Sequence, residues 1–160
     1  FDDDTIRRNY EFYEPRTVHE SSLSPCVHAI LAAKLGLKEK AYEFYLRTSR
    51  LDLDDYNNDT EDGCHITSMA GTWMAVVKGF GGMRVRDGRV HLAPFCPAQW
   101  ESFAFNVRFR GHLLNVKATQ REVTIGNASP QPLTLVVFDH DLTVAGNETV
   151  AVAIPLINPA

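Results

Sequence analysis

Several functional groups lie close together between Asp62 and Gly71, at the beginning of a predicted helix. His65, Thr67 and Ser68 would converge where the first backbone amides lack an intrahelical partner and the helix dipole is positive. Hydroxyls, an imidazole and free amides at a helix N-terminus favour an anion such as phosphate or a carboxylate. A simpler arrangement uses the same residues: Thr67 or Ser68 caps the helix, and His65 is a hydrogen-bonded neighbour.

A second polar stretch covers residues 13–24 and is dense in Glu, Arg, His and Ser. Placed just before a helix, such a segment could line a polar cleft. It could equally be a surface loop whose hydroxyls cap the helix.

Other chemistry is weakly supported. No Gly-x-Ser-x-Gly motif marks a nucleophile elbow, and no glycine-rich phosphate loop follows a strand. The acidic run Leu51–Asp55 lacks the spacing and the terminal Glu of a calcium loop. Trp73 and Trp100 could pack in a core or offer flat surfaces to sugar rings. The three cysteines, Cys26, Cys64 and Cys96, form no CxxC pair, so we expect free thiols and no metal site.

The elements that position these groups change in type near residue 80. Apolar positions follow a helical period in three segments, which begin at Ser24-Pro25, at about Lys38 and near Thr67 or Ser68. We expect Gly36 to end the first helix, Arg50 to end the second, and Gly79, Gly81 and Gly82 to end the third. The first two form an antiparallel pair because their connection is very short.

The second half alternates between apolar and polar residues, which predicts strands. Asp87-Gly88 joins two such runs and is a strong hairpin signal. Further strands are expected at 102–110, 113–119, 121–125, 133–138 and 149–154, separated by turn formers at Gly126-Asn127, Ser129-Pro130 and Gly146-Asn147. Short strands at this spacing predict an antiparallel sandwich or jelly roll.

Composition narrows the class of protein. The chain has 160 residues, of which 44% are hydrophobic, and a net charge of −4. These values predict a globular fold and argue against nucleic-acid binding, which usually needs a basic face. No apolar run is long enough to span a membrane, and the acidic first residues do not resemble a secretory signal, so we expect a cytoplasmic protein. Sequons at Asn58, Asn127 and Asn147 indicate exposed loops at most.

Taken in order, the two polar stretches and the motifs around them resemble glycoside hydrolase family 65, which includes maltose, kojibiose, nigerose and trehalose phosphorylases. The resemblance is close over about residues 7–115, and its long, ordered motifs are highly specific. They lie at Tyr13–Pro25, Arg50–Asn57, Asp62–Trp73 and Gly79–Arg84.

The resemblance implies an α+β chain: residues 1–82 as the last helices of an (α/α)6 catalytic barrel, and residues 83–160 as a C-terminal β-sandwich. It also implies an inverting enzyme in which phosphate attacks the anomeric carbon of an α-linked glucose disaccharide and releases β-glucose 1-phosphate. Inorganic phosphate is then the co-substrate, without any cofactor. The general acid is expected upstream of Phe1, so neither Glu14 nor Glu20 is assigned to that role.

The resemblance also assigns residues to the site. His65, Thr67 and Ser68 match the segment that surrounds phosphate, while Glu14, Arg16 and His19 match a motif that borders the cleft. Arg16 could bind an anion through two parallel hydrogen bonds, or clamp Glu14.

Three hypotheses stay open. The protein could be a phosphorylase, such as a maltose or kojibiose phosphorylase. It could be a hydrolase of the same fold, such as a trehalase or glucosidase, with Glu61 or Asp62 as the base. The chain by itself could be a fragment, or a sugar-binding or assembly module, without turnover. We expect the isolated chain to be inactive, and its partners to be the rest of its own barrel and, as in many relatives, a second copy. We also expect exposed apolar surface around Leu31 and Tyr42.

Overall fold

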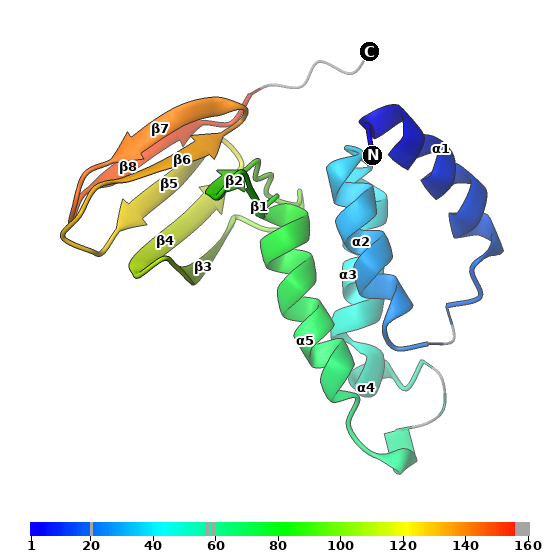
Figure 1. Ribbon diagram of the computed structural model, residues 1–160. Helices are drawn as coiled ribbons and strands as arrows, with labels where there is room; N and C mark the ends of the chain where they lie inside the picture. Colours follow the sequence, from blue (N-terminus) through cyan, green and yellow to red (C-terminus); the bar gives the residue numbers. More distant parts are fainter. Residues whose placement is uncertain (20, 57, 59, 156–160) are drawn as a thin grey trace. The chain divides into compact units, whose positions relative to one another are not determined.

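The computed structural model describes residues 1–19, 21–56, 58 and 60–155, with the side chain of Asp62 also outside the description. Glu20 therefore lies outside the described residues, as does the carboxylate of Asp62. The chain forms two compact units, Phe1–Phe80 and Gly81–Ala160. The first is helical and the second consists of sheets (Figure 1).

The helical unit contains five α-helices among its described residues. They are α1 (Asp3–Tyr13), α2 (Ser24–Lys34), α3 (Lys38–Ser49), α4 (Leu51–Asp54) and α5 (Ile66–Met74). Two 3-10 turns, η1 (Glu14–Arg16) and η2 (Thr60–Asp62), lie between them, and the π-helical segment η3 (Ala75–Phe80) continues α5. The three predicted helices are therefore present, whereas α1 was not predicted.

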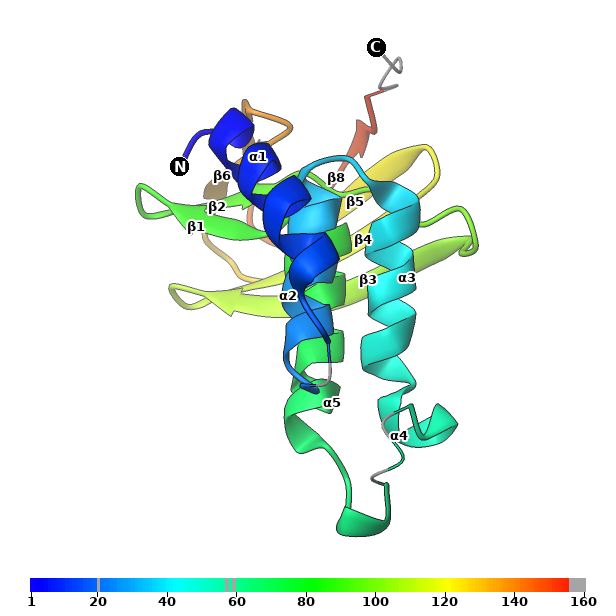
Figure 2. The ribbon, with the colours of Figure 1, turned by 90° about the vertical axis from the view of Figure 1, so that its right-hand side faces the viewer.

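Helices α2, α3 and α5 run side by side (Figure 2). Ala29 of α2, Phe44 of α3 and Ala75 of η3 are buried together, with Tyr45 packed against them. Gly36 has φ +77 and ends α2, as predicted, because a left-handed residue suits the turn into α3. Gly79 does not end the third helix but lies within η3; the chain leaves the helix at Gly81-Gly82 instead.

The second unit has eight described strands in two sheets of four. They are β1 (Arg84–Arg86), β2 (Arg89–Leu92), β3 (Ser102–Phe109), β4 (His112–Thr119), β5 (Glu122–Asn127), β6 (Leu133–Val137), β7 (His140–Val144) and β8 (Thr149–Ala153). The sheet orders are β1-β2-β6-β7 and β3-β4-β5-β8. Inward-facing side chains of both sheets are fully buried, among them Leu92, Val116, Ile125, Leu135 and Val144. The prediction of helices followed by a β-sandwich is confirmed.

Two details of the sandwich differ from the prediction. The pairing of β2 with β6 is parallel, while the other pairs are antiparallel. Gly126 and Asn127 do not form a turn but end β5, and Asn127 is 1% exposed. Its amide donates to the carbonyl oxygens of Gln131 and Val144 at 2.7 and 3.3 Å, so this sequon is not an exposed loop.

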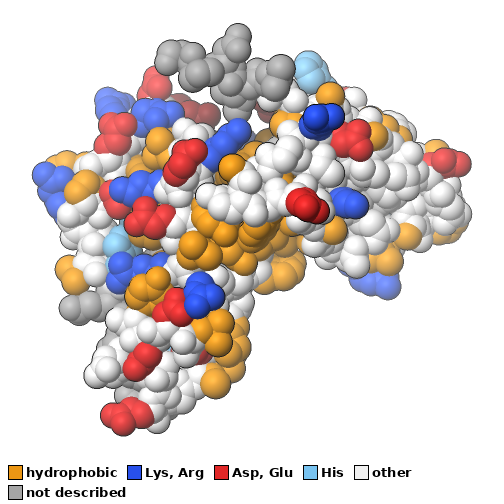
Figure 3. All heavy atoms as spheres, turned by 180° about the vertical axis from the view of Figure 1, so that it is seen from behind, with side chains coloured by type: hydrophobic (Ala, Val, Ile, Leu, Met, Phe, Trp, Pro, Cys, Tyr) orange, Lys and Arg blue, Asp and Glu red, His pale blue; other side chains and the backbone are white. Residues whose placement is uncertain are grey.

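The exposed apolar surface also lies elsewhere than expected. Leu31 and Tyr42 are half-buried. Three exposed apolar side chains lie on α5, where Ile66 is 67%, Met69 51% and Trp73 52% exposed. These three positions share one face of the helix because they are spaced by three and four residues. Hydrophobic side chains reach the surface of the helical unit in Figure 3.

Within the described residues, no helix combines the length and apolar character needed to cross a bilayer, and no cluster of His, Cys, Asp or Glu could hold a metal ion. The three cysteines are free thiols; Cys26 and Cys96 are buried and Cys64 is exposed.

Candidate functional site

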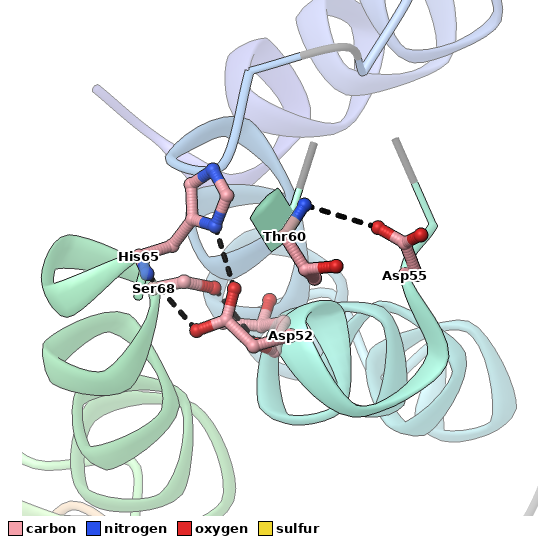
Figure 4. Close-up of polar contacts among 6 residues, drawn as sticks. Asp52, Asp55, Thr60, His65 and Ser68 are labelled. Atoms are coloured by element: carbon pink, nitrogen blue, oxygen red, sulfur yellow. Dashed lines mark hydrogen bonds and ion pairs between the residues drawn. The ribbon is translucent and has the colours of Figure 1, made fainter. Parts of the chain in front are cut away.

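The start of α5 is built on the carboxylate of Asp52. Its Oδ1 lies 2.6 Å from Nδ1 of His65, and its Oδ2 accepts a hydrogen bond of 2.9 Å from the His65 backbone N–H (Figure 4). Both contacts lower the pKa of Asp52, the side-chain hydrogen bond most. The ionised Asp52 carboxylate therefore holds His65 at two points, its backbone N–H and its imidazole ring. The second ring nitrogen of His65 points away from Asp52 in Figure 4.

Sequence reasoning did not single out Asp52 for this role. It lies in α4, one turn beyond the end of α3, in the acidic run that fails as a calcium loop. Other acids of that run are used locally: Arg50 donates to Asp54 at 2.7 Å, and Asp55 accepts from the Thr60 backbone N–H at 3.1 Å. A carboxylate thirteen residues before a histidine has no periodic signal, so only the folded chain brings the two together.

Most amides at the start of α5 are already used, in contrast to the expectation of several free donors. Ile66 N–H donates to the Cys64 carbonyl at 3.0 Å. Ser68 N–H and Met69 N–H both donate to the His65 carbonyl, at 2.9 and 3.2 Å. For Thr67 N–H the described residues provide no partner. The tightened first turn therefore leaves one amide, not four, for an outside acceptor.

Thr67 and Ser68 differ in where their hydroxyls lie. Thr67 is an exposed residue in the first turn of α5. Ser68 is 2% exposed, and its Oγ donates to the Thr48 carbonyl at 2.8 Å. That carbonyl belongs to the last turn of α3, where carbonyls lack helical partners. Neither side chain caps the helix: the N-cap residue is His65, whose side chain makes no capping bond.

Close packing holds α5 against α2 and α3 just beyond this turn. A Cβ atom on Gly71 would lie 2.9 Å from Cys26 Cβ and 3.4 Å from Thr48 Cγ2. Only glycine lets the helices approach this closely. The orientation of the turn at residues 65–68 is thus fixed on one side by Asp52 and on the other by the contact at Gly71.

The first polar stretch is held by three different helices. Glu14 forms an ion pair of 2.9 Å with Lys40 of α3. Arg16 donates to the Phe12 carbonyl at 2.7 Å and stacks over the Phe12 ring, 4.2 Å from its centroid. Arg16 therefore does not clamp Glu14; Lys40 takes that place because α3 brings its ammonium nearer. Arg16 is exposed, whereas the Glu14 side chain is only 15% exposed.

His19 is packed inside the same region. Its Nδ1 lies 2.8 Å from Ser24 Oγ, and its ring contacts those of His28 and Phe44 at centroid distances of 4.5 and 4.9 Å. The Arg47 guanidinium donates to its backbone carbonyl at 2.8 Å. Burial lowers the pKa of His19, and nearby His28 and Arg47 lower it further. Nε2 of His19 is buried with no hydrogen-bond partner in the described part of the chain.

Comparison with known proteins matches each unit to a profile from the same family. The profile of the glycosyl hydrolase family 65 central catalytic domain covers residues 1–74. The profile of the glycosyl hydrolase family 65 C-terminal domain covers residues 83–144. The chain belongs to glycosyl hydrolase family 65. The resemblance seen in the motifs is thereby confirmed.

Individual relatives of this family 65 chain are phosphorylases. A maltose phosphorylase of Bacillus subtilis is 52% identical over 140 residues, which are 88% of this chain and 18% of the relative. An alpha,alpha-trehalose phosphorylase of Thermoanaerobacter brockii is 45% identical over 92% of this chain and 19% of the relative. A solved structure, a putative kojibiose phosphorylase from the human microbiome, superposes with a TM-score of 0.93 at 38% identity.

That structural match covers 100% of this chain and 23% of the solved chain. The family 65 chain thus spans about a fifth of the length of the relatives it matches. The family's members named above are enzymes, and this chain corresponds to one part of such an enzyme.

Proposed function

We propose that this chain is the C-terminal part of an inverting disaccharide phosphorylase, and that it contributes the phosphate-binding side of the active site. The reaction is attack by a phosphate oxygen on the anomeric carbon of an α-linked glucoside. The new C–O bond forms as the glycosidic bond breaks, and β-glucose 1-phosphate is released. The departing oxygen takes its proton from a general acid outside this chain.

The observation that carries the proposal is the outward-facing turn at the start of α5. Thr67 offers a backbone N–H without a described partner and an exposed hydroxyl, at the positive end of a helix of nine residues. His65 stands beside them, with its orientation set by Asp52.

The three predicted phosphate residues then have different roles. Thr67 and His65 would contact phosphate directly. Ser68 would position them, since its hydroxyl ties the turn to the end of α3. We assign Glu14, Arg16 and His19 to the wall of the sugar cleft, where the Lys40 pair and the Phe12 stack would hold the first two in place.

The named relatives support phosphorolysis over hydrolysis, since each is a phosphorylase. A hydrolase would need a carboxylate base at the position of phosphate. Glu61, one of the two acids near the turn, lies exposed in η2. The donors at Thr67 suit an anion better than a neutral water.

A matched pair of variants in the full-length enzyme tests the role of Thr67. Thr67→Val removes the hydroxyl and keeps the shape, whereas Thr67→Ser keeps the hydroxyl. We expect Thr67→Val to raise KM for phosphate by about tenfold, the worth of a hydrogen bond to a charged group, and to leave KM for the disaccharide nearly unchanged. Thr67→Ser should stay close to the parent. If Thr67→Val has parental phosphate kinetics, this assignment is wrong.

A further inference from the structure

The sheet unit contains a depression that the proposed reaction does not use. It has a volume of about 550 Å³, opens broadly to solvent, and is lined by Gln99, Trp100, Glu101, Ser102 and Phe103. These residues connect the loop after β2 to the first two positions of β3. Pockets of several hundred cubic ångströms are of the size that holds small ligands.

Hydrogen bonds to its backbone hold the loop that forms the depression in place. Trp100 N–H closes a turn onto the Pro97 carbonyl at 2.9 Å. The amide of Gln120, from the turn between β4 and β5, donates to the carbonyls of Pro97 and Trp100 at 2.8 and 2.7 Å. A ligand bound here would pay little to order the backbone, because these bonds already fix it.

The Trp100 ring is supported in the same way. It is half-buried and packs edge-on against Phe103, with centroids 6.1 Å apart and an angle of 63°. Phe103 is 8% exposed and stacks in turn on Phe105. The sandwich core therefore anchors one side of the indole, while the indole lines the open depression. A rigid aromatic surface of this kind offers contact area at low entropic cost.

The polar groups around Trp100 indicate the class of ligand. Gln99, Glu101 and Ser102 are exposed and supply an amide, a carboxylate and a hydroxyl. The described lining residues include no Lys or Arg, and Glu101 carries a negative charge, so phosphate and nucleic acid are disfavoured. These three side chains favour a ligand with hydrogen-bonding groups over a purely apolar one. An apolar face beside hydrogen-bonding groups matches a neutral sugar ring, which has C–H faces and a rim of hydroxyls.

We propose that the depression at Trp100 binds a glucose unit of an α-linked oligosaccharide, with the ring stacked on the indole and its hydroxyls bonded to Glu101 and Gln99. The choice of α-linked glucose rests on the proposed function. Sugar binding at Trp100 needs neither phosphate nor turnover, so a binding titration tests it. The proposed phosphorolysis is tested separately, by the phosphate dependence of cleavage.

Tryptophan fluorescence reports on this surface directly, because the chain has two tryptophans, Trp73 and Trp100. In Trp73→Phe, Trp100 is the single reporter. We expect saturable changes in its emission with maltose or maltotriose, with a Kd in the millimolar range, about −4 kcal/mol. Inorganic phosphate should cause no change in the emission of Trp100. Circular dichroism of each variant checks that the sandwich is folded.

Two variants complete the test by calorimetric titration with the same sugars. Trp100→Ala should abolish binding, and Glu101→Ala should weaken it by about five- to tenfold, the worth of a hydrogen bond to a charged group. Absence of saturable change in Trp73→Phe up to about ten times the expected Kd would overturn the proposal. Undiminished binding by folded Trp100→Ala would overturn it equally.

Discussion

At the scale of single residues, the candidate site depends on contacts between segments that are separated in sequence. The sequence placed His65, Thr67 and Ser68 at the beginning of a helix, and they do lie at the start of α5. It did not distinguish their roles: Thr67 faces outward, whereas Ser68 is buried against the Thr48 carbonyl. Asp52 was missed as the partner of His65, since nothing local links a carboxylate in one helix to a ring before another.

His19 makes the stability of the helical unit depend on pH. Its pKa is lowered from 6.5 in the folded chain, first by burial and then by His28, Arg47 and Lys40, while Glu14 acts in the opposite direction. Below pH 6.5 the unfolded chain therefore binds a proton more readily than the folded one, so stability should fall as pH falls from 6.5 toward the folded pKa. Above 6.5 this residue should contribute no pH dependence.

Urea unfolding between pH 5 and 8, compared for the parent and His19→Asn, measures this effect. Asparagine suits the left-handed backbone at this position, where φ is +52. The variant should be less stable than the parent at every pH, because packing against Phe44 is lost. Its free energy of unfolding should fall less steeply than that of the parent as the pH drops below 6.5. If the free energies of the two proteins depend on pH equally in this range, His19 does not cause the dependence.

At the scale of elements, the sequence predicted correctly those turns and strands whose conformation depends on neighbouring residues. Asp87-Gly88 forms the expected hairpin, because both residues adopt positive φ, +49 and +70. Gly126-Asn127 has the composition of a turn but lies in β5, where the buried Asn127 amide donates to three backbone carbonyls. The parallel pairing of β2 and β6 joins segments far apart in sequence and had no signal. Helix α1 has an N-cap in Asp2, but Tyr10 is its one buried residue, so it offers few apolar positions from which a helix could be predicted.

Gly71 should be required for the packing of α5. In Gly71→Ala the new methyl group would lie 2.9 Å from Cys26 Cβ, a contact that neither rigid group can relieve. The cost of overpacking, about 1–3 kcal/mol, exceeds or offsets the gain of about 1 kcal/mol from helix propensity. We expect a net loss of up to about 2 kcal/mol in the free energy of unfolding, measured in urea.

Gly79→Ala is the matched control, because the same change there places Cβ no closer than 3.6 Å to any neighbour. This variant should unfold with the parental free energy or slightly more. Equal effects of the two substitutions would show that helix propensity, and not the contact with Cys26, determines the result.

At the scale of the whole molecule, the helical unit has an apolar face that its own helices do not cover. Ile66, Met69 and Trp73 lie on one side of α5 with half or more of each side chain exposed. Family 65 relatives are about five times longer than this chain, and we propose that the rest of the barrel covers this face. The isolated chain should therefore bind a hydrophobic dye such as ANS.

Replacing Met69 and Trp73 with glutamine should reduce the dye signal without unfolding the chain, because both side chains are largely exposed. Val85→Gln on β1 is the control, since Val85 is also exposed, at 55%, but belongs to the sheet unit. A parental chain that remains monomeric and binds no dye would contradict the proposal of a missing cover.

The enzyme that contains this chain is proposed to cleave its glucoside with phosphate. The decisive measurement is disaccharide cleavage by the full-length protein in buffers with and without inorganic phosphate, with products identified by NMR. Maltose, kojibiose and trehalose are the substrates to test, since relatives carry these names. We predict β-glucose 1-phosphate in stoichiometric amounts with phosphate and no cleavage without it. Equal cleavage to free glucose in phosphate-free buffer would identify a hydrolase and contradict the account.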